Sequence, residues 1–187
     1  MRPTTSGEGA SMEVHVVPEL ETKRLIVTAL TLERLHAAIG DRDLLGRLLE
    51  ADIPDDWPNS EFGGFLPVLA QQILEEPALG EWTGLIIRKH ERVLVGDVGF
   101  KGLPDAEGAV EIGYSIVPAY QGNGYASEAT QAMVNWAFGH ESVRRVTANC
   151  LNDNRASIRV LQTVGMTQIG RSGPLLDWSL ERTERKT

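Results

Sequence analysis

The chain has 187 residues, of which 42% are hydrophobic and 24% charged, a composition typical of one globular domain with a single core. Lys and Arg total 18 against 26 Asp and Glu, so the net charge of −8 excludes a broad basic surface for nucleic acid and favours a cationic partner. The lone cysteine, Cys150, excludes an intrachain disulfide framework and is typical of a reducing compartment, so we expect a cytoplasmic protein.

The two ends of the chain differ from its middle. Residues 1–12 lack the apolar core of a signal peptide, and no apolar run reaches membrane-spanning length, so we expect no membrane partner. We expect a flexible tail over residues 1–18, the domain over residues 19–182 and a short second tail over residues 183–187. The sequence leaves open whether the protein is a monomer or a homodimer.

The first part of the domain combines a strand with helices. Residues 24–28 predict a strand, and a helix is expected to begin with Thr31 as its N-cap. Leucines at helical spacing over residues 44–49 and apolar residues over 61–76 predict two further helices. Residues 52–59 form a proline-broken acidic loop, for which we weigh two interpretations, a solvated loop and the lining of an acceptor pocket.

The rest of the domain alternates strands and helices. Strands are predicted over residues 82–89, 93–100, 109–117, 144–151, 166–170 and 175–181, and helices over 126–138 and 155–164. The first three of these strands form an antiparallel meander. This order predicts an α/β (α+β) domain built on one mixed, mostly antiparallel sheet of about six to seven strands with helices on both faces.

The segment from Gln121 to Ala126 joins a predicted strand to a predicted helix. Gly122 and Gly124 can adopt positive φ without a Cβ penalty, so successive N–H groups can turn towards one phosphate. The helix that follows adds its N-terminal amides and its dipole. The segment is therefore either an anion-binding turn or simply a tight connection. A dinucleotide site is not indicated, because Ser127 occupies the third glycine position of that motif.

The strand over residues 109–117 has two unlike faces. Period-two alternation places large apolar side chains on one face and Glu111, Gly113 and Ser115 on the other. A carboxylate beside a glycine leaves both a charge and empty space, which a ligand cleft explains. The alternative is that Glu111 lies on a solvated face of the sheet.

Three features together resemble the GNAT superfamily of acyl-CoA-dependent N-acyltransferases. They are the strand that contains Glu111, the turn from Gln121, which matches Gln/Arg-x-x-Gly-x-Gly/Ala, and Asn154-Arg155-Ala156-Ser157 followed by Gly165. Glu111-Ile112-Gly113-Tyr114 together with Asn154-x-x-Ser157 resembles the branch that contains the ribosomal-protein N-terminal acetyltransferases. The motifs cover residues 109–166, and the element order extends the likeness over 19–182, which implies a GNAT-like fold.

The resemblance implies a site for acetyl-CoA as acyl donor. Main-chain groups of Ile116 and Val117 would pair with the pantetheine arm where two strands splay apart. The pyrophosphate would lie against Gln121, Gly122, Asn123, Gly124, Tyr125 and Ala126. Asn154 and Ser157 would lie near the sulfur, and helix capping is a compatible alternative for both. No metal is expected, because the four histidines show no metal-ligand spacing.

The expected reaction is acetyl transfer to a primary amine, either a protein N-terminus or a small molecule. Glu111 is the candidate base, acting through water, and Ser157 the candidate group that assists the departing thiol, with water as the alternative proton donor. Many members have a tyrosine acid where this chain has Gln162, and residues 170–174 make a short final hairpin. Both departures motivate the alternative of a non-catalytic acyl-CoA sensor. The acceptor and the preferred acyl length stay open.

Overall fold

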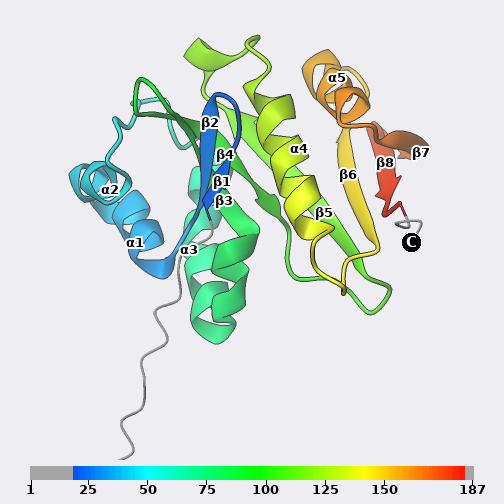
Figure 1. The fold of residues 1–187 in the computed structure, drawn as a ribbon, viewed down its shortest axis with the longest axis horizontal. Helices are drawn as coiled ribbons and strands as arrows, with labels where there is room; N and C mark the ends of the chain where they lie inside the picture. The colour runs from blue at the N-terminus through cyan, green and yellow to red at the C-terminus, as the bar shows by residue number, and fades with distance from the viewer. Residues whose placement is uncertain (1–18, 184–187) are drawn as a thin grey trace, which may run out of the picture.

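One eight-stranded sheet organises the protein, in the order β1-β2-β3-β4-β5-β6-β8-β7 (Figure 1). The computed structural model describes residues 19–183, so the tail predicted for 1–18, and all but the first residue of the tail predicted for 183–187, lie outside the described residues. The strands are β1 (Glu19–Glu21), β2 (Leu25–Ala29), β3 (Thr83–Arg88), β4 (Val93–Phe100), β5 (Ala109–Ile116), β6 (Arg145–Leu151), β7 (Thr167–Ser172) and β8 (Leu175–Glu181). The helices are α1 (Leu32–Gly40), α2 (Arg42–Leu49), α3 (Ser60–Glu75), α4 (Tyr125–Ala137) and α5 (Arg155–Thr163), with short 3-10 helices η1 (Pro77–Trp82) and η2 (Pro118–Tyr120).

The mixed, mostly antiparallel sheet predicted from the sequence is confirmed. Every neighbouring pair is antiparallel except β5 and β6, which run parallel. All seven predicted strands are present. The eighth strand, β1, pairs with β2 and was not predicted, because its three residues are too few for a periodicity signal.

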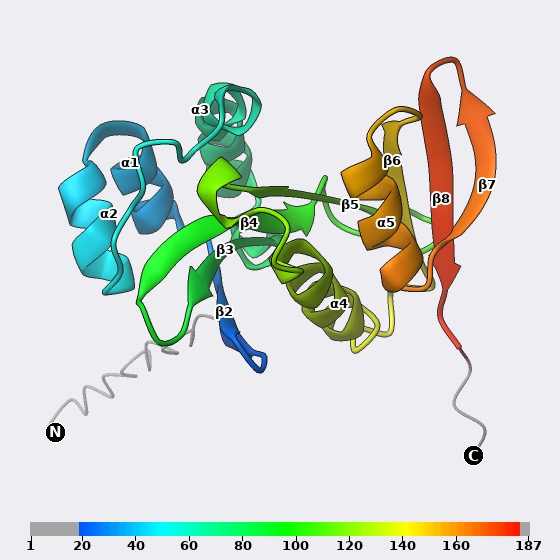
Figure 2. The same ribbon diagram turned by 90° about the horizontal axis from the view of Figure 1, so that it is seen from above.

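Helices cover both faces of the sheet, as predicted. Figure 2 shows α1, α2 and α3 on one face and α4 and α5 on the other. Each layer has its own buried apolar cluster, one built around α4 and α5 and the other around α1, α2 and α3. Because the sheet is covered on both faces, its central strands β3 and β4 are buried almost throughout. Within the described residues, no helix is long and apolar enough to cross a membrane.

The parallel pair β5 and β6 separates after three residues. Pairing runs only from Ala109 with Arg145 to Glu111 with Thr147. Beyond that point β6 continues its pairing with β8, whereas β5 continues its pairing with β4. The edge of β5 that faces β6 is therefore open from Ile112 to Ile116, and main-chain polar groups on an open edge need partners.

Candidate active site

The main-chain groups on the open edge of β5 follow from its pairing with β4. The N–H of Val117 donates to Val95 O at 2.9 Å, and Glu111 O accepts from Lys101 N at 2.8 Å. Odd-numbered residues of β5 therefore direct their main-chain groups to β4, and the even-numbered ones, Tyr114 and Ile116 among them, direct theirs to the open edge.

This pattern corrects one predicted donor contact. Both main-chain groups of Val117 are bonded within the protein, the N–H to Val95 and the carbonyl to Tyr120 N at 2.9 Å. Val117 is also 3% exposed, so neither of its main-chain groups is directed to the open edge. Ile116 does lie on the open edge, and its carbonyl accepts from Gln121 Nε2 at 2.9 Å. Tyr114 takes the place of Val117 as the second residue of that edge.

Glu111 lies on the face of the sheet that α1, α2 and α3 cover, at the last residue of β5 that pairs with β6. Its Oε1 accepts from Lys101 Nζ at 2.5 Å and from Asn149 Nδ2 at 2.6 Å. Its side chain is 34% exposed. Two residues along, a Cβ added at Gly113 would meet only Lys101 Cε, at 4.0 Å. The carboxylate therefore borders open space, the combination for which the sequence predicted a ligand cleft.

A buried carboxylate lies further along the same face. Asp97 of β4 is 5% exposed, and its Oδ2 accepts from Ser115 Oγ at 2.8 Å and from Trp57 Nε1 at 3.0 Å. Burial raises the pKa of Asp97 to about 6, although the hydrogen bonds from Ser115 and Trp57 act to lower it.

The loop over residues 52–59 combines exposed and buried side chains, and the lining of an acceptor pocket stays a prediction for it. Asp55 and Asp56 are exposed, whereas Trp57 is 2% exposed and packs against the sheet.

The sequence did not single out Asp97, yet a carboxylate inside the apolar run from Val93 to Phe100 is the signal that could have identified it.

On the opposite face, Tyr114 meets the start of α5. Its phenol oxygen lies 2.9 Å from Ser157 Oγ, and either oxygen can be the donor. Burial raises the pKa of Tyr114 to about 12, with the Ser157 hydrogen bond acting against the shift, so the phenol keeps its proton at neutral pH. Gln162, by contrast, is exposed on α5. The phenol near Ser157 thus comes from β5 rather than from the helix position where many family members have one.

Asn154 caps the helix that presents Ser157. Its Oδ1 accepts from Ser157 N at 3.0 Å, which is the capping role weighed from the sequence. The expected contact between Asn154 and a cofactor stays a prediction. Ser157 is half-buried, and its Oγ faces Tyr114.

The turn from Gln121 to Ala126 connects η2 to α4, and one of its side chains binds carbonyl groups at its start. Gly122 and Gly124 have φ values of +75° and +79°, the left-handed region that glycine favours. Asn123 Nδ2 donates to Tyr120 O at 3.1 Å and to Gln121 O at 3.0 Å. The side chain of Asn123 therefore binds carbonyls at the start of the turn, and that of Gln121 binds the carbonyl of Ile116 at the end of β5, while Tyr125 is buried at 7% exposure.

The N–H groups of this turn are left free. Four of the five α-helices in the described residues begin with a side-chain cap, from Thr31, Asp41, Asn59 and Asn154. The fifth, α4, begins at Gly124 without one. Within residues 19–183, no acceptor is found for the N–H groups of residues 122–127. These donors, together with the α4 dipole, make the turn electropositive despite the negative net charge.

The family comparison agrees with this geometry. Residues 24–167 match the family model for the acetyltransferase (GNAT) domain. The chain belongs to the GNAT acetyltransferase family. One relative of this GNAT protein, the uncharacterized N-acetyltransferase YjdG of Bacillus subtilis (strain 168), is 31% identical over 160 residues, which cover 85% of this chain and 95% of the relative. The predicted enzyme class, an acetyltransferase that uses acetyl-CoA, is thereby confirmed.

Solved structures share the GNAT fold. The ribosomal-protein-S5-alanine acetyltransferase of Vibrio fischeri has a TM-score of 0.65 at 19% identity, covering 91% of this chain and 100% of that one. The ribosomal L7/L12 α-N-protein acetyltransferase RimL, solved in complex with coenzyme A, has a TM-score of 0.61 at 18% identity, covering 88% and 98%. The neighbours thus include ribosomal-protein acetyltransferases, the branch that the sequence motifs resemble.

Proposed function

We propose that this GNAT protein transfers the acetyl group of acetyl-CoA to a primary amine by direct attack in a ternary complex. The observation that carries the proposal is the open edge of β5, which leads from Glu111 to an uncapped glycine turn. A donor molecule laid along this edge has its anionic end at the free N–H groups and its thioester near Glu111 and Ser157. Acceptors of this kind are a protein N-terminus or a small cationic amine.

The donor is bound mostly by main-chain groups in this proposal. The pantetheine arm pairs with Tyr114 and Ile116 on the open edge, and the pyrophosphate lies against the N–H groups of Gly122 to Ala126. Asn123 acts by holding the carbonyls of Tyr120 and Gln121 away from the anion, and Gln121 connects the turn to the carbonyl of Ile116. The RimL neighbour was solved with coenzyme A, which supports the choice of donor.

The proposed chemistry needs a base on the face of β5 from which the amine approaches, the face that carries Glu111. The amine nitrogen bonds to the carbonyl carbon, the carbon–sulfur bond breaks, and the amine proton passes through water to Glu111. An acceptor with a lysine-like pKa costs roughly 4 to 5 kcal/mol to deprotonate at pH 7, whereas an α-amine costs only about 1 kcal/mol. The Glu111 carboxylate is oriented for this task by Lys101 and Asn149.

The departing thiolate faces the other side of the strand. Ser157, hydrogen-bonded to the neutral phenol of Tyr114, is the group placed to donate to the sulfur. A thiol with a pKa of about 8.5 already leaves readily near neutral pH, so this assistance is small. The sheet therefore separates base and acid, with Glu111 on one face and Ser157 on the other.

The test combines binding with turnover. Thermal shift with acetyl-CoA reports binding, and thiol release across α-amines, polyamines, aminoglycosides and peptide N-termini reports transfer. We expect stabilisation by acetyl-CoA and thiol release with at least one class of amine. Stabilisation without release for any class would favour the acyl-CoA sensor that the exposed Gln162 motivates.

A further inference from the structure

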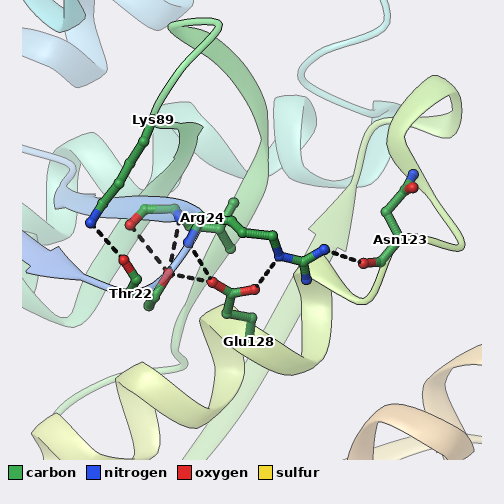
Figure 3. Close-up of polar contacts among 6 residues, drawn as sticks. Thr22, Arg24, Lys89, Asn123 and Glu128 are labelled. Atoms are coloured by element: carbon green, nitrogen blue, oxygen red, sulfur yellow. Dashed lines mark hydrogen bonds and ion pairs between the residues drawn. The ribbon is translucent and has the colours of Figure 1, made fainter.

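Arg24, in the corner between β1 and β2, contacts the glycine turn 99 residues away in sequence (Figure 3). Its Nη1 donates to Asn123 O at 2.9 Å. Its guanidinium lies 4.6 Å from the centre of the Tyr125 ring, and its Nη2 is 3.5 Å from the position of a Cβ added at Gly124. Arg24 therefore packs against three consecutive residues of the turn.

The same arginine binds Glu128 in the first turn of α4. Arg24 Nε donates to Glu128 Oε2 at 2.7 Å, and the main-chain N–H of Arg24 donates to Oε1 at 2.9 Å. Thr22 Oγ1 also donates to Oε1, at 2.6 Å. Partial burial acts to raise the pKa of Glu128, but the hydrogen bonds from Thr22 and Arg24 outweigh it and lower that pKa. Glu128 is therefore fully ionised near neutral pH.

The corner that carries Arg24 is itself fixed to the sheet. Lys89, directly after β3, donates from Nζ to Thr22 O at 2.6 Å (Figure 3). The same Nζ donates to Glu21 Oε2 at 2.8 Å. Its main-chain N–H donates to Arg24 O at 3.0 Å. The side chain of Arg24 thus extends from a corner that is hydrogen-bonded to the residue after β3.

Glu128 creates an electrostatic conflict that Arg24 resolves. A carboxylate in the first turn of α4 interacts favourably with the helix dipole. The same negative charge repels an anion bound at the N–H groups of the preceding turn. The ion pair between the Arg24 guanidinium and Glu128 offsets that charge locally, and the main-chain N–H of Arg24 adds a second hydrogen bond to the carboxylate. The Nη1 bond to Asn123 O turns that carbonyl towards the guanidinium, so the neighbouring N–H groups stay available to an anion.

We propose that Arg24 is a positioning residue for the diphosphate of the acetyl donor, which it serves by fixing the Asn123 carbonyl and neutralising Glu128. This inference rests on the proposed function of the glycine turn. Arg24 is not part of the motifs that carry the family resemblance in residues 109–166. The corner between β1 and β2 thereby has a role in donor binding.

The experiment compares four variants with the wild-type protein: Arg24→Ala, Glu128→Gln, the double variant and Arg182→Ala. Arg182 is the matched control, because its guanidinium also binds main-chain carbonyls, those of Phe138 and His140, directly after the other end of α4. Calorimetry with coenzyme A gives Kd, and steady-state kinetics separates KM for acetyl-CoA from kcat.

We expect Arg24→Ala to raise Kd and KM for acetyl-CoA about tenfold at low ionic strength, with kcat nearly unchanged. Glu128→Gln in the Arg24→Ala background should recover part of that loss, because the unpaired carboxylate is then gone. Arg182→Ala should bind coenzyme A as the wild type does, and both arginine variants should lose similar thermal stability. Turnover of acetyl-pantetheine, which lacks the diphosphate, should be equal in wild type and Arg24→Ala.

Equal coenzyme A affinity in wild type and Arg24→Ala would overturn the inference while leaving the proposed function intact. An equal loss of affinity in Arg182→Ala would also overturn it, because that result would indicate a general effect on α4. So would a double variant that binds no better than Arg24→Ala. Wild-type protein that fails to bind coenzyme A would instead overturn the proposed function itself.

Discussion

Replacing Asp97 by Asn should change the stability of the protein by an amount that depends on pH and that moves in favour of the variant as the pH rises from about 4 to about 7. Burial raises the pKa of the Asp97 carboxyl in the folded protein from its ordinary value of 3.8 to about 6. Between these two pH values the folded protein holds a proton that the unfolded chain has released. The free energy of unfolding therefore falls as pH rises from about 4 to about 6, and this contribution is constant above that range.

The size of the effect follows from the shift. Each pKa unit corresponds to 1.36 kcal/mol, so a shift of about two units destabilises the ionised wild type by about 3 kcal/mol at pH 7. An asparagine keeps one oxygen that can accept from Ser115 and Trp57 and carries no charge. Its Nδ2 group needs a new partner, but that cost does not change with pH. Because the carboxyl is already partly ionised in the unfolded chain at pH 4, the expected change in the difference between the two proteins from pH 4 to pH 7 is about 2.5 kcal/mol.

Urea unfolding at pH 4, 5, 6 and 7, followed by far-ultraviolet circular dichroism, measures this difference. Tryptophan fluorescence is unsuitable, because Trp57 Nε1 binds the group that titrates. Subtracting the wild-type curve from that of Asp97→Asn removes the other titrating groups. A difference that stays constant from pH 4 to pH 7 would refute the reasoning, since Asp97 would then titrate alike in folded and unfolded protein.

Three further predictions concern the proposed reaction. Glu111→Gln should lower kcat by a factor of about 10² to 10⁴ with little change in coenzyme A affinity, measured by thiol release and calorimetry. An unchanged kcat would exclude Glu111 as the base. Gly124→Val should abolish coenzyme A binding, because valine is strained at φ +79°. Gly173→Val, at φ +64° in the last hairpin, is its control and should bind normally. Tyr114→Phe should lower kcat by only about fivefold, the worth of one neutral hydrogen bond to Ser157, and a loss of kcat as large as that of Glu111→Gln would contradict this.

The glycine turn could be predicted from the sequence because its signals are local. The positive φ values at Gly122 and Gly124 and the start of α4 all arise within a few adjoining residues. The same holds for the Asn154 cap, whose acceptor and donor are three residues apart. Short-range chemistry of this kind does not depend on how the strands are ordered.

The features that the sequence did not reveal depend on long-range pairing. The alternation in β5 was evident, but whether Tyr114 or Val117 faces the open edge depends on which side β4 pairs. Asp97 and Trp57 are 40 residues apart, and Arg24 and Glu128 are 104 apart. Along the linear sequence, the two members of the second pair are ordinary surface charges. Only the folded chain brings them together.

The most direct test of the central claim is mass-spectrometric detection of the acetylated amine after wild-type protein is mixed with acetyl-CoA and the amine panel. The proposed reaction predicts one amide product per coenzyme A released, with the acetyl group on nitrogen, and a product yield that collapses in Glu111→Gln. Coenzyme A that binds tightly while no amine in the panel gains an acetyl group would contradict the proposal of acetyl transfer to an amine.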